Sequence, residues 1–452
     1  MADETKGGFL DRTLRNVRNA WQNIAGSQYD AEAASMRPHL PDDDVRRLRE
    51  QMRACLETRG GEVSARARAA ALGRAYLNLD ETGRQRFLRV LAEDFDVDKA
   101  SVDGAVVDLR AATEPNERRK AEAKLQKALE APRVRLLTQF NALPEGMKFL
   151  VDMRAELLSL ARKDPIFKPV EADLKRLLTS WFDVGLLELH QITWDSAPAS
   201  LLERLIAYEA VHAIQSWDDL KNRLASDRRC FAYFHPRMPD EPLIFVEVAL
   251  VNGLASNVQE LLDEEAPIQD PQTADTAIFY SISNAQKGLA GISFGNFLIK
   301  RVVDSLSAEF KGIKTFATLS PVPGFRAWLE RTLPEDETAR MLADDPDWHQ
   351  DSQTAETLRA PMMHLCARYL AKEKHGRGTA LDPVAHFHLT NGARMERLNW
   401  MADTSETGLQ RAGGMMINYL YKLSNIDANH EAYTGSGKVV ASSSIKGIAK
   451  GK

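Results

Sequence analysis

The chain has 452 residues, more than a single ordinary hydrophobic core organises, so at least two domains are expected. Hydrophobic residues make up 44% of the sequence and charged residues 27%, which is typical of a globular protein and excludes a disordered or fibrous one. The net charge of −5 gives no general attraction for nucleic acid, so we expect no nucleic-acid partner. Any site for an anion must therefore be built locally from a few lysines or arginines.

Cysteine usage and the apolar segments indicate a cytoplasmic protein without a membrane partner. The three cysteines lie far apart and form no CxxC pair, which argues against a zinc knuckle or a disulfide framework: Cys55, Cys230 and Cys366. The most apolar run, residues 242–255, is shorter than the roughly 20 residues that span a bilayer. The N-terminus has Asp3 and Glu4 where a secretory signal would have basic residues.

The N-terminal half has the pattern of an all-α domain, which we place at residues 1–181. Apolar residues recur at spacings of three and four between charged faces, and Gly or Pro interrupts each segment. Asp42-Asp43-Asp44 offers capping oxygens to the first helix, which Gly60-Gly61 ends. Further helices are predicted at residues 64–79, 81–95, 116–129, 133–143, 146–162 and 170–181. The highly charged stretch 110–127 predicts a solvated helix or helical hairpin rather than a basic binding patch.

The C-terminal half, residues 182–452, changes to short β-rich runs bounded by turn residues. Strands are predicted at residues 230–235, 243–250, 277–283, 314–319 and 384–389, and helices at 292–310, 354–374 and 409–423. Residues from Gly435 onward are rich in Gly, Ser and Lys and predict a loosely held tail. The fold class is thus a multidomain α and α+β protein, with a helical bundle followed by a mixed β-sheet domain flanked by helices.

A glycine-containing loop, residues 284–295, follows the predicted strand 277–283 and leads into the next helix. Glycine lets the backbone approach a pyrophosphate closely, and the free N–H groups at a helix start carry partial positive charge. Lys287 could add a point charge. Neither GxGxxG nor GxxxxGK[ST] is present, so neither a dinucleotide nor nucleoside triphosphate hydrolysis is indicated. The loop is a candidate phosphate site for an acyl-CoA, with a simple tight turn as the alternative.

Three stretches of this half resemble known families. Residues 286–291, Gln-Lys-Gly-Leu-Ala-Gly, resemble a variant of the pyrophosphate loop of the GNAT acetyltransferase superfamily. Residues 316–325 and 382–393 together resemble the malonyl-CoA decarboxylase family, and further matches run from residue 180 to residue 421. The resemblance implies a GNAT-like catalytic domain that converts malonyl-CoA to acetyl-CoA and CO2. It also implies a homo-oligomer, a dimer or tetramer, assembled through the helical domain.

The same resemblance implies the site residues. It places the catalytic serine on Ser320, the catalytic histidine on His388 and a supporting tyrosine on Tyr421. The residues expected to bind the acyl-CoA substrate are Gln286, Lys287, Gly288, Ala290, Gly291, Ile292, Ser293, Phe294, Gly295 and Asn296. Ser293 stands where some members of the family have a glutamate, which makes an essential role for that carboxylate doubtful here.

The chemistry of decarboxylation fits these residue types. Loss of CO2 leaves an enolate whose charge rests on the thioester oxygen, so the substrate is its own electron sink, and neither an organic cofactor nor a metal is expected. His388, with an ordinary pKa of about 6.5, could carry a proton near neutral pH and deliver it to carbon. Ser320 is predicted to end a strand before the stiff Pro321–Pro323 turn, and Tyr421 to lie on a helix that starts near Leu409.

Other interpretations of these residues remain open at this stage. His386 and His388, if they alternate on a strand, could also bind a metal, but no third ligand stands at a recognisable spacing. Of Tyr419 and Tyr421, one is a candidate for the core instead. The same half of the chain could serve an N-acyltransferase, or a non-catalytic acyl-CoA sensor. The sequence is compatible with two physiological settings, malonate catabolism and the control of fatty acid metabolism.

Overall fold

The computed structural model describes Val17, Trp21 and residues 36–57, 61–292, 297–376 and 378–451. The chain forms two compact units. The first contains residues 1–186, 235–239 and 286–293, and the second contains residues 187–234, 240–285 and 294–452. The helical unit therefore includes two short segments that come from much later in the sequence.

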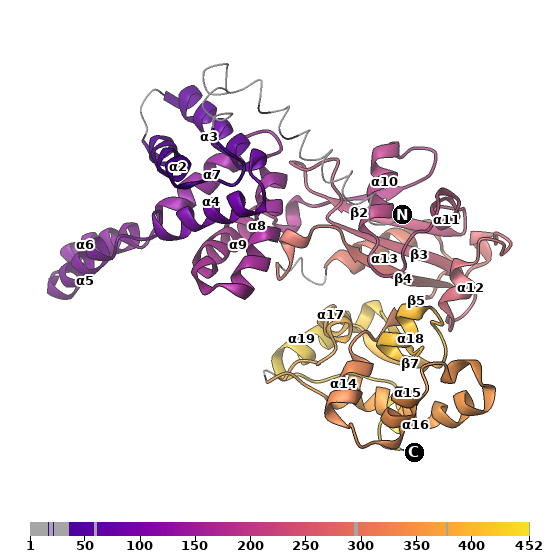
Figure 1. Ribbon diagram of the computed structural model, residues 1–452. Coiled ribbons are helices and arrows are strands. Elements are labelled where there is room, and N and C mark those ends of the chain that lie inside the picture. The colour runs from indigo at the N-terminus through magenta and orange to yellow at the C-terminus, as the bar shows by residue number, and fades with distance from the viewer. Residues whose placement is uncertain are drawn as a thin grey trace. The chain divides into compact units, whose positions relative to one another are not determined.

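The first unit is all-α, as the sequence predicts. Its helices are α2 (Asp42–Leu56), α3 (Gly61–Asn78), α4 (Glu81–Glu93), α5 (Lys99–Ala111), α6 (Pro115–Ala128), α7 (Pro132–Asn141), α8 (Gly146–Lys163) and α9 (Lys168–Trp181), shown in Figure 1. Phe149 of α8 lies at the centre of an aromatic cluster and meets the rings of Tyr76 and Phe140 edge to face, with centroids 5.5 and 5.2 Å away. Such edge-to-face pairs add to the stabilisation from apolar burial.

Two local predictions for this unit have different outcomes. The solvated hairpin is confirmed, because α5 and α6 pair with each other and each buries one residue, Ala105 and Ala121, while the hairpin projects from the other helices of the unit (Figure 1). The predicted cap of α2 is wrong. Its N-cap residue is Pro41, which makes no side-chain capping bond, and the aspartates lie in the first turn, where their charge still favours the helix dipole.

The second unit is built on a sheet that has eight strands in the described part of the chain. They are β1 (Glu188–Ile192), β2 (Arg228–Phe234), β3 (Ile244–Val251), β4 (Thr276–Asn284), β5 (Thr315–Thr318), β6 (Ser320–Pro321), β7 (Arg394–Asn399) and β8 (Met416–Leu420). The order is β1-β2-β3-β4-β5-β8-β6, and β7 also pairs with β8. Among the paired strands of the described residues, only β4 and β5 run parallel, and helix α13 (Phe297–Glu309) connects them. The predicted class, a helical region followed by a mixed sheet with flanking helices, is confirmed.

Helices cover both faces of this sheet. On one face, α10 (Ala199–Tyr208) and α11 (Trp217–Arg223) form a buried cluster with alternate residues of β2, among them Phe234. Its neighbour Tyr233 points to the opposite face, as alternation along a strand requires. There its hydroxyl donates to the carbonyl oxygen of Leu298 in α13 at 2.7 Å. The helix after β4 therefore lies on the opposite face of the sheet from α10 and α11.

Two predicted elements of the C-terminal half are wrong. Residues 384–389 are not a strand but part of α17 (Pro383–Thr390), because the Asp382 carboxylate caps the first turn and Pro383 occupies a position where no N–H is needed. Residues 409–423 are not one helix. Helix α18 (Glu406–Ala412) ends at Gly413, whose φ of 59° stops the helix, and β8 follows.

The remaining helices cover the outer part of the second unit, and the C-terminal tail is one of them. They are α12 (Val258–Leu262), α14 (Phe325–Thr332), α15 (Glu337–Asp344), α16 (Ser352–Lys372), α19 (Ile426–Ser436) and α20 (Ser443–Ile448). The prediction of a loose tail is wrong, because Ile445 of α20 is fully buried and Ser442 N–H donates to the Met395 carbonyl at 2.8 Å. None of the helices in the described ranges is long and apolar enough to cross a membrane.

Candidate active site

The second unit brings the three predicted catalytic residues into one hydrogen-bonded chain. Ser320 Oγ lies 3.0 Å from Nε2 of His388, and Nδ1 of the same ring lies 2.8 Å from the hydroxyl of Tyr421. Ser320 comes from β6, His388 from α17, and Tyr421 from the residue after β8. All three are buried, with exposed fractions of 5%, 3% and 2%. Segments that are 101 residues apart in sequence thus meet at one imidazole.

Local structure explains why these side chains converge. Successive residues of a strand point to opposite faces, so Tyr419 and Tyr421, two residues apart at the end of β8, share a face. The ring of Tyr419 stacks on His388, with centroids 4.4 Å apart and an interplanar angle of 24°. Both tyrosines therefore belong to the site, whereas a helix would have turned them apart. The alternation Tyr-x-Tyr was the sequence signal for this arrangement.

Burial decides the charge state of the site. Burial of the imidazole disfavours its charged form and lowers the pKa of His388 to about 3, and burial likewise raises the pKa of Tyr421 well above its ordinary value. Both groups are therefore neutral at neutral pH. The expectation that His388 carries a proton near neutrality is wrong for this environment. A neutral imidazole has one nitrogen that donates and one that accepts, and so it can pass a proton between Ser320 and Tyr421.

Asp382 is a neighbour of the site that sequence reasoning did not single out. Its Oδ1 accepts hydrogen bonds from the backbone N–H groups of Val384 and Ala385 at 3.0 and 2.9 Å, which fixes the start of the helix that carries His388. The hydroxyl of Tyr369 donates to its other oxygen at 3.3 Å. Burial raises the pKa of this carboxyl. The Asp-Pro pair at a helix start was the signal that could have identified it.

The hydroxyl of Tyr419 is a buried polar group of the same neighbourhood. Within the described ranges it has no hydrogen-bond partner, although the residue is fully buried. A buried hydroxyl without a partner is uncommon in folded proteins, and such groups tend to mark functional regions.

The predicted acyl-CoA loop divides into buried and accessible parts. Gln286, Gly288, Leu289 and Ile292 are buried, whereas Lys287, Ala290 and Gly291 are exposed. The predicted residues Ser293, Phe294, Gly295 and Asn296 lie outside the described residues. Among the loop residues that the structure describes, these exposed ones are accessible to a ligand, and Gly291, with φ of +71°, has the backbone conformation that glycine favours.

Gly288 has a packing role in the helical unit. A Cβ at this position would lie 1.8 Å from the carbonyl oxygen of Val151 in α8. On the same helix, Nη2 of the buried Arg154 donates to the Ala290 carbonyl at 2.9 Å and to Glu171 at 2.8 Å. The loop backbone is therefore held against α8, and the glycine at 288 is required by this close approach whether or not a phosphate binds.

The two histidines considered as metal ligands do not lie on a strand. They are on α17, and Nδ1 of His386 lies 2.8 Å from the hydroxyl of Tyr433, a partner that His388 does not share. In the ranges that the structure describes, no three His, Cys, Asp or Glu side chains gather where they could hold a metal ion.

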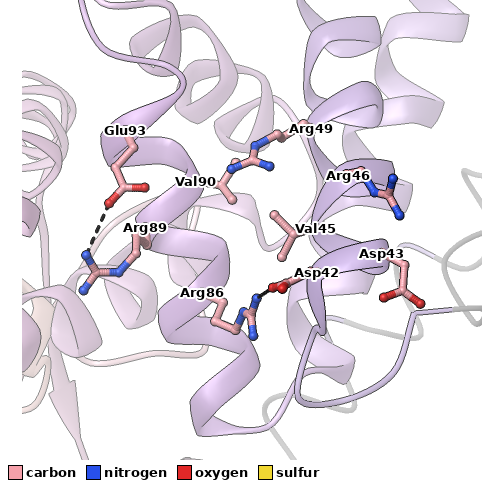
Figure 2. Close-up of a pocket in the computed structure, with 9 residues that line it drawn as sticks. All are labelled: Asp42, Asp43, Val45, Arg46, Arg49, Arg86, Arg89, Val90 and Glu93. Atoms are coloured by element: carbon pink, nitrogen blue, oxygen red, sulfur yellow. Dashed lines mark hydrogen bonds and ion pairs between the residues drawn. The ribbon is translucent and has the colours of Figure 1, made fainter.

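A surface pocket lies between α2 and α4 of the first unit (Figure 2). It is lined by Asp42, Asp43, Val45, Arg46, Arg49, Arg86, Arg89, Val90 and Glu93. Two of its four arginines pair with acidic residues of the same pocket, Arg86 with Asp42 and Arg89 with Glu93 at 3.3 Å, as the dashed lines show. It contains none of the predicted site residues.

Comparisons with known proteins agree over nearly the whole chain. Family models of the malonyl-CoA decarboxylase N-terminal and C-terminal domains match residues 95–182 and 185–452. Mitochondrial malonyl-CoA decarboxylase of Anser anser anser is 36% identical over 96% of this chain and 94% of its own. That of Rattus norvegicus is 37% identical over 85% and 82%.

Solved structures give the same result. The crystal structure of malonyl-CoA decarboxylase from Rhodopseudomonas palustris has a TM-score of 0.84 at 44% identity, covering 89% of this chain and 99% of the other. That from Agrobacterium vitis has a TM-score of 0.82 at 42% identity, with the same coverage. A helical domain followed by a mixed-sheet domain is thus the architecture of a group of carboxy-lyases. The chain belongs to the malonyl-CoA decarboxylase family.

Proposed function

We propose that this protein converts malonyl-CoA to acetyl-CoA and CO2, with Ser320, His388 and Tyr421 as the reacting groups. The observation that supports the proposal is the buried serine–imidazole–tyrosine chain in a member of this family. The curated relatives that match over most of their length are named malonyl-CoA decarboxylases.

The reaction needs proton transfer more than it needs a charged acid. The bond between the carboxylate carbon and C2 breaks, CO2 leaves, and the electron pair stays on the thioester as an enolate. Protonation of that enolate at C2 then gives acetyl-CoA. In the proposed mechanism the Ser320 hydroxyl gives its proton to C2. The Ser320 oxygen then takes the proton from Nε2 of His388, and Nδ1 of His388 takes the proton from the Tyr421 hydroxyl. One proton from solvent restores Tyr421, so each turnover takes up one proton. Positioned proton donors of this kind contribute roughly 10²–10⁴-fold to a rate.

The substrate and setting follow from the same proposal. Lys287, Ala290 and Gly291 are the described loop residues available to the CoA moiety. Because the thioester accepts the charge, no organic cofactor or metal is required. Further parts of the proposal are self-association through the helical unit, a GNAT-like fold of the sheet domain and a cytoplasmic location. The animal relatives are named mitochondrial.

The test measures both products. Purified protein is incubated with malonyl-CoA after exhaustive treatment with a chelator, and CO2 and acetyl-CoA are quantified. Equal amounts of both are expected, with a fall of at least about 100-fold in Ser320→Ala. Ser307→Ala is the control, because the Ser307 hydroxyl donates its hydrogen bond to the Val303 carbonyl within α13. Acyl transfer to an added amine without CO2 would indicate an N-acyltransferase instead, and binding without turnover would indicate a sensor.

A further inference from the structure

The strand that carries Ser320 is interrupted without losing its register. Ala317 of β5 pairs with Leu420 of β8, and Ser320 of β6 pairs with Ile417. The two positions are three apart in number on each strand, so the antiparallel register is the same on both sides of the break. The pairing with β8 is thus interrupted at residues 318–319, and this interruption is neither a bulge nor a frayed end, since a bulge would shift the register by one residue.

Side chains replace one backbone hydrogen bond at this break. Antiparallel ladders bond alternate residue pairs, and Tyr421 N–H donates to the Phe316 carbonyl at 2.8 Å. The next bond in this series would join Tyr419 N–H to the Thr318 carbonyl. Tyr419 N–H instead donates to the side-chain Oγ1 of Thr318 at 3.1 Å, and the carbonyl accepts from Nδ2 of Asn418 at 2.7 Å.

The Asn418 amide that completes this exchange is itself fixed. It is fully buried and makes four hydrogen bonds, which is the full capacity of its amide. Besides Thr318, Nδ2 donates to the Ala255 carbonyl at 3.0 Å, and Oδ1 accepts from Asn399 at 2.9 Å and from Arg397 at 3.2 Å. A fully satisfied buried polar network of this kind specifies one arrangement of the strands.

The exchange places the Thr318 hydroxyl beside Ser320. The two residues are two apart along the strand direction and share a face, and Ser320 Oγ donates to Thr318 Oγ1 at 2.8 Å. Because the Tyr419 N–H already occupies one lone pair of that oxygen, only one lone pair and the hydroxyl proton remain for other partners. Thr318 is fully buried, so water does not compete for them.

We propose that Thr318 is a positioning residue for the decarboxylation, whose hydroxyl, anchored by the main-chain N–H of Tyr419, holds Ser320 on the His388 imidazole. At rest it accepts the Ser320 proton. When Ser320 gives that proton to C2, the Thr318 hydroxyl turns and donates to the Ser320 oxygen, which then receives two donors, Thr318 O–H and His388 Nε2–H. This inference rests on the proposed function for its reaction, while the hydrogen-bond arrangement stands on the geometry alone.

The rate test compares three variants of the full-length protein. Thr318→Val keeps the shape but removes the hydroxyl, and we expect kcat to fall about tenfold or more, with KM for malonyl-CoA changed less than about threefold, because one hydrogen bond to a developing charge is lost. Thr318→Ser should restore kcat to within about threefold of wild type. Thr276→Val is the control, because its buried hydroxyl donates only to Asp275 at the start of β4.

A second readout separates this inference from the proposed function. The ring nitrogens of His388 are followed by NMR in protein labelled with ¹⁵N-histidine, and assigned by comparison with His388→Asn. Thr318→Val should shift the Nε2 signal, whereas Thr318→Ser should leave it near the wild-type position, whether or not the protein turns over malonyl-CoA. An unchanged signal together with wild-type kcat in Thr318→Val overturns the proposal. Equal loss of activity in both Thr318 variants, with lowered melting temperatures, would also overturn it, because the residue would then be only structural.

Discussion

The buried imidazole of His388 should make the stability of the folded protein depend on pH. In the folded state burial lowers its pKa to about 3, and in the unfolded chain an exposed histidine has a pKa of about 6.5. Between these two pKa values the unfolded chain binds one proton at this histidine, and the folded protein does not. The free energy of unfolding therefore falls as pH drops below about 6.5, by about 1.4 kcal/mol per pH unit, and stops falling near pH 3. At pH 5 the free energy of unfolding should therefore be about 2 kcal/mol lower than above pH 6.5 because of this group alone.

The assay is urea unfolding at pH 7.5 and at pH 5.0, at one protein concentration, for wild type and His388→Asn. Other groups that titrate in this range are common to both proteins, so their effects cancel in the comparison. The wild type should lose about 2 kcal/mol more than the variant between the two pH values.

An equal loss of stability in wild type and His388→Asn would refute the reasoning. It would mean that the imidazole is protonated in the folded protein at pH 5, and that burial does not hold the pKa of His388 below its ordinary value. A direct titration of the His388 ring signals would show the same failure as a transition near pH 6.

Two further predictions concern the loop and the helix that carries the histidine. Gly291→Ala should raise the Kd for CoA in calorimetry at least about fivefold. Gly253→Ala is the control, because Gly253 has a φ of +73° with open space around it, so the substitution introduces the same backbone strain and should leave Kd unchanged. Equal effects in both variants would show that residue 291 is not in the binding site. Asp382→Ala removes the cap of α17, so it should lower the free energy of unfolding by about 1–2 kcal/mol and also lower kcat. Asp382→Asn keeps the accepting oxygen and should retain most of the stability and most of kcat. Unchanged stability and kcat in Asp382→Ala would show that the cap does not position His388.

The parts of the fold that follow from local pattern were predictable from the sequence. The apolar runs of β3 and β4 lie inside the sheet between helices on both faces, so their continuous apolar character correctly predicted buried strands. The helices of the first unit have charged faces and apolar stripes, and their pattern predicted an all-α unit. These elements bury one face or two in a regular way, which is the property that periodicity measures.

The errors have local physical causes. The run Val384–Leu389 is short and rich in apolar and aromatic residues, which does not distinguish a strand from a buried helix, and the cap at Asp382 decided between them. Gly413 and Gly414 both have positive φ and end α18, so periodicity alone extended that helix too far. The convergence of Ser320 with His388 could be expected only through family resemblance, because no local rule brings β6, α17 and β8 together. Thr318 and Asn418 were missed because their roles arise from an exchanged hydrogen bond between two strands.

The helical unit includes segments from much later in the sequence, and this has a consequence for how the protein folds during synthesis. Ala290, whose carbonyl accepts from Arg154, lies 136 residues further along the chain, and His235, 54 residues after Trp181, lies 3.1 Å from its carbonyl oxygen. A ribosome that adds about 5–20 residues per second delivers Ala290 about 7–27 s after Arg154. The N-terminal helices leave the ribosome first but wait for these segments before their last buried polar groups are satisfied. A fragment that ends at residue 186 lacks those partners, so we expect it to be less stable than the same helices in the whole chain, and we expect chaperone dependence during synthesis to be greatest in this interval.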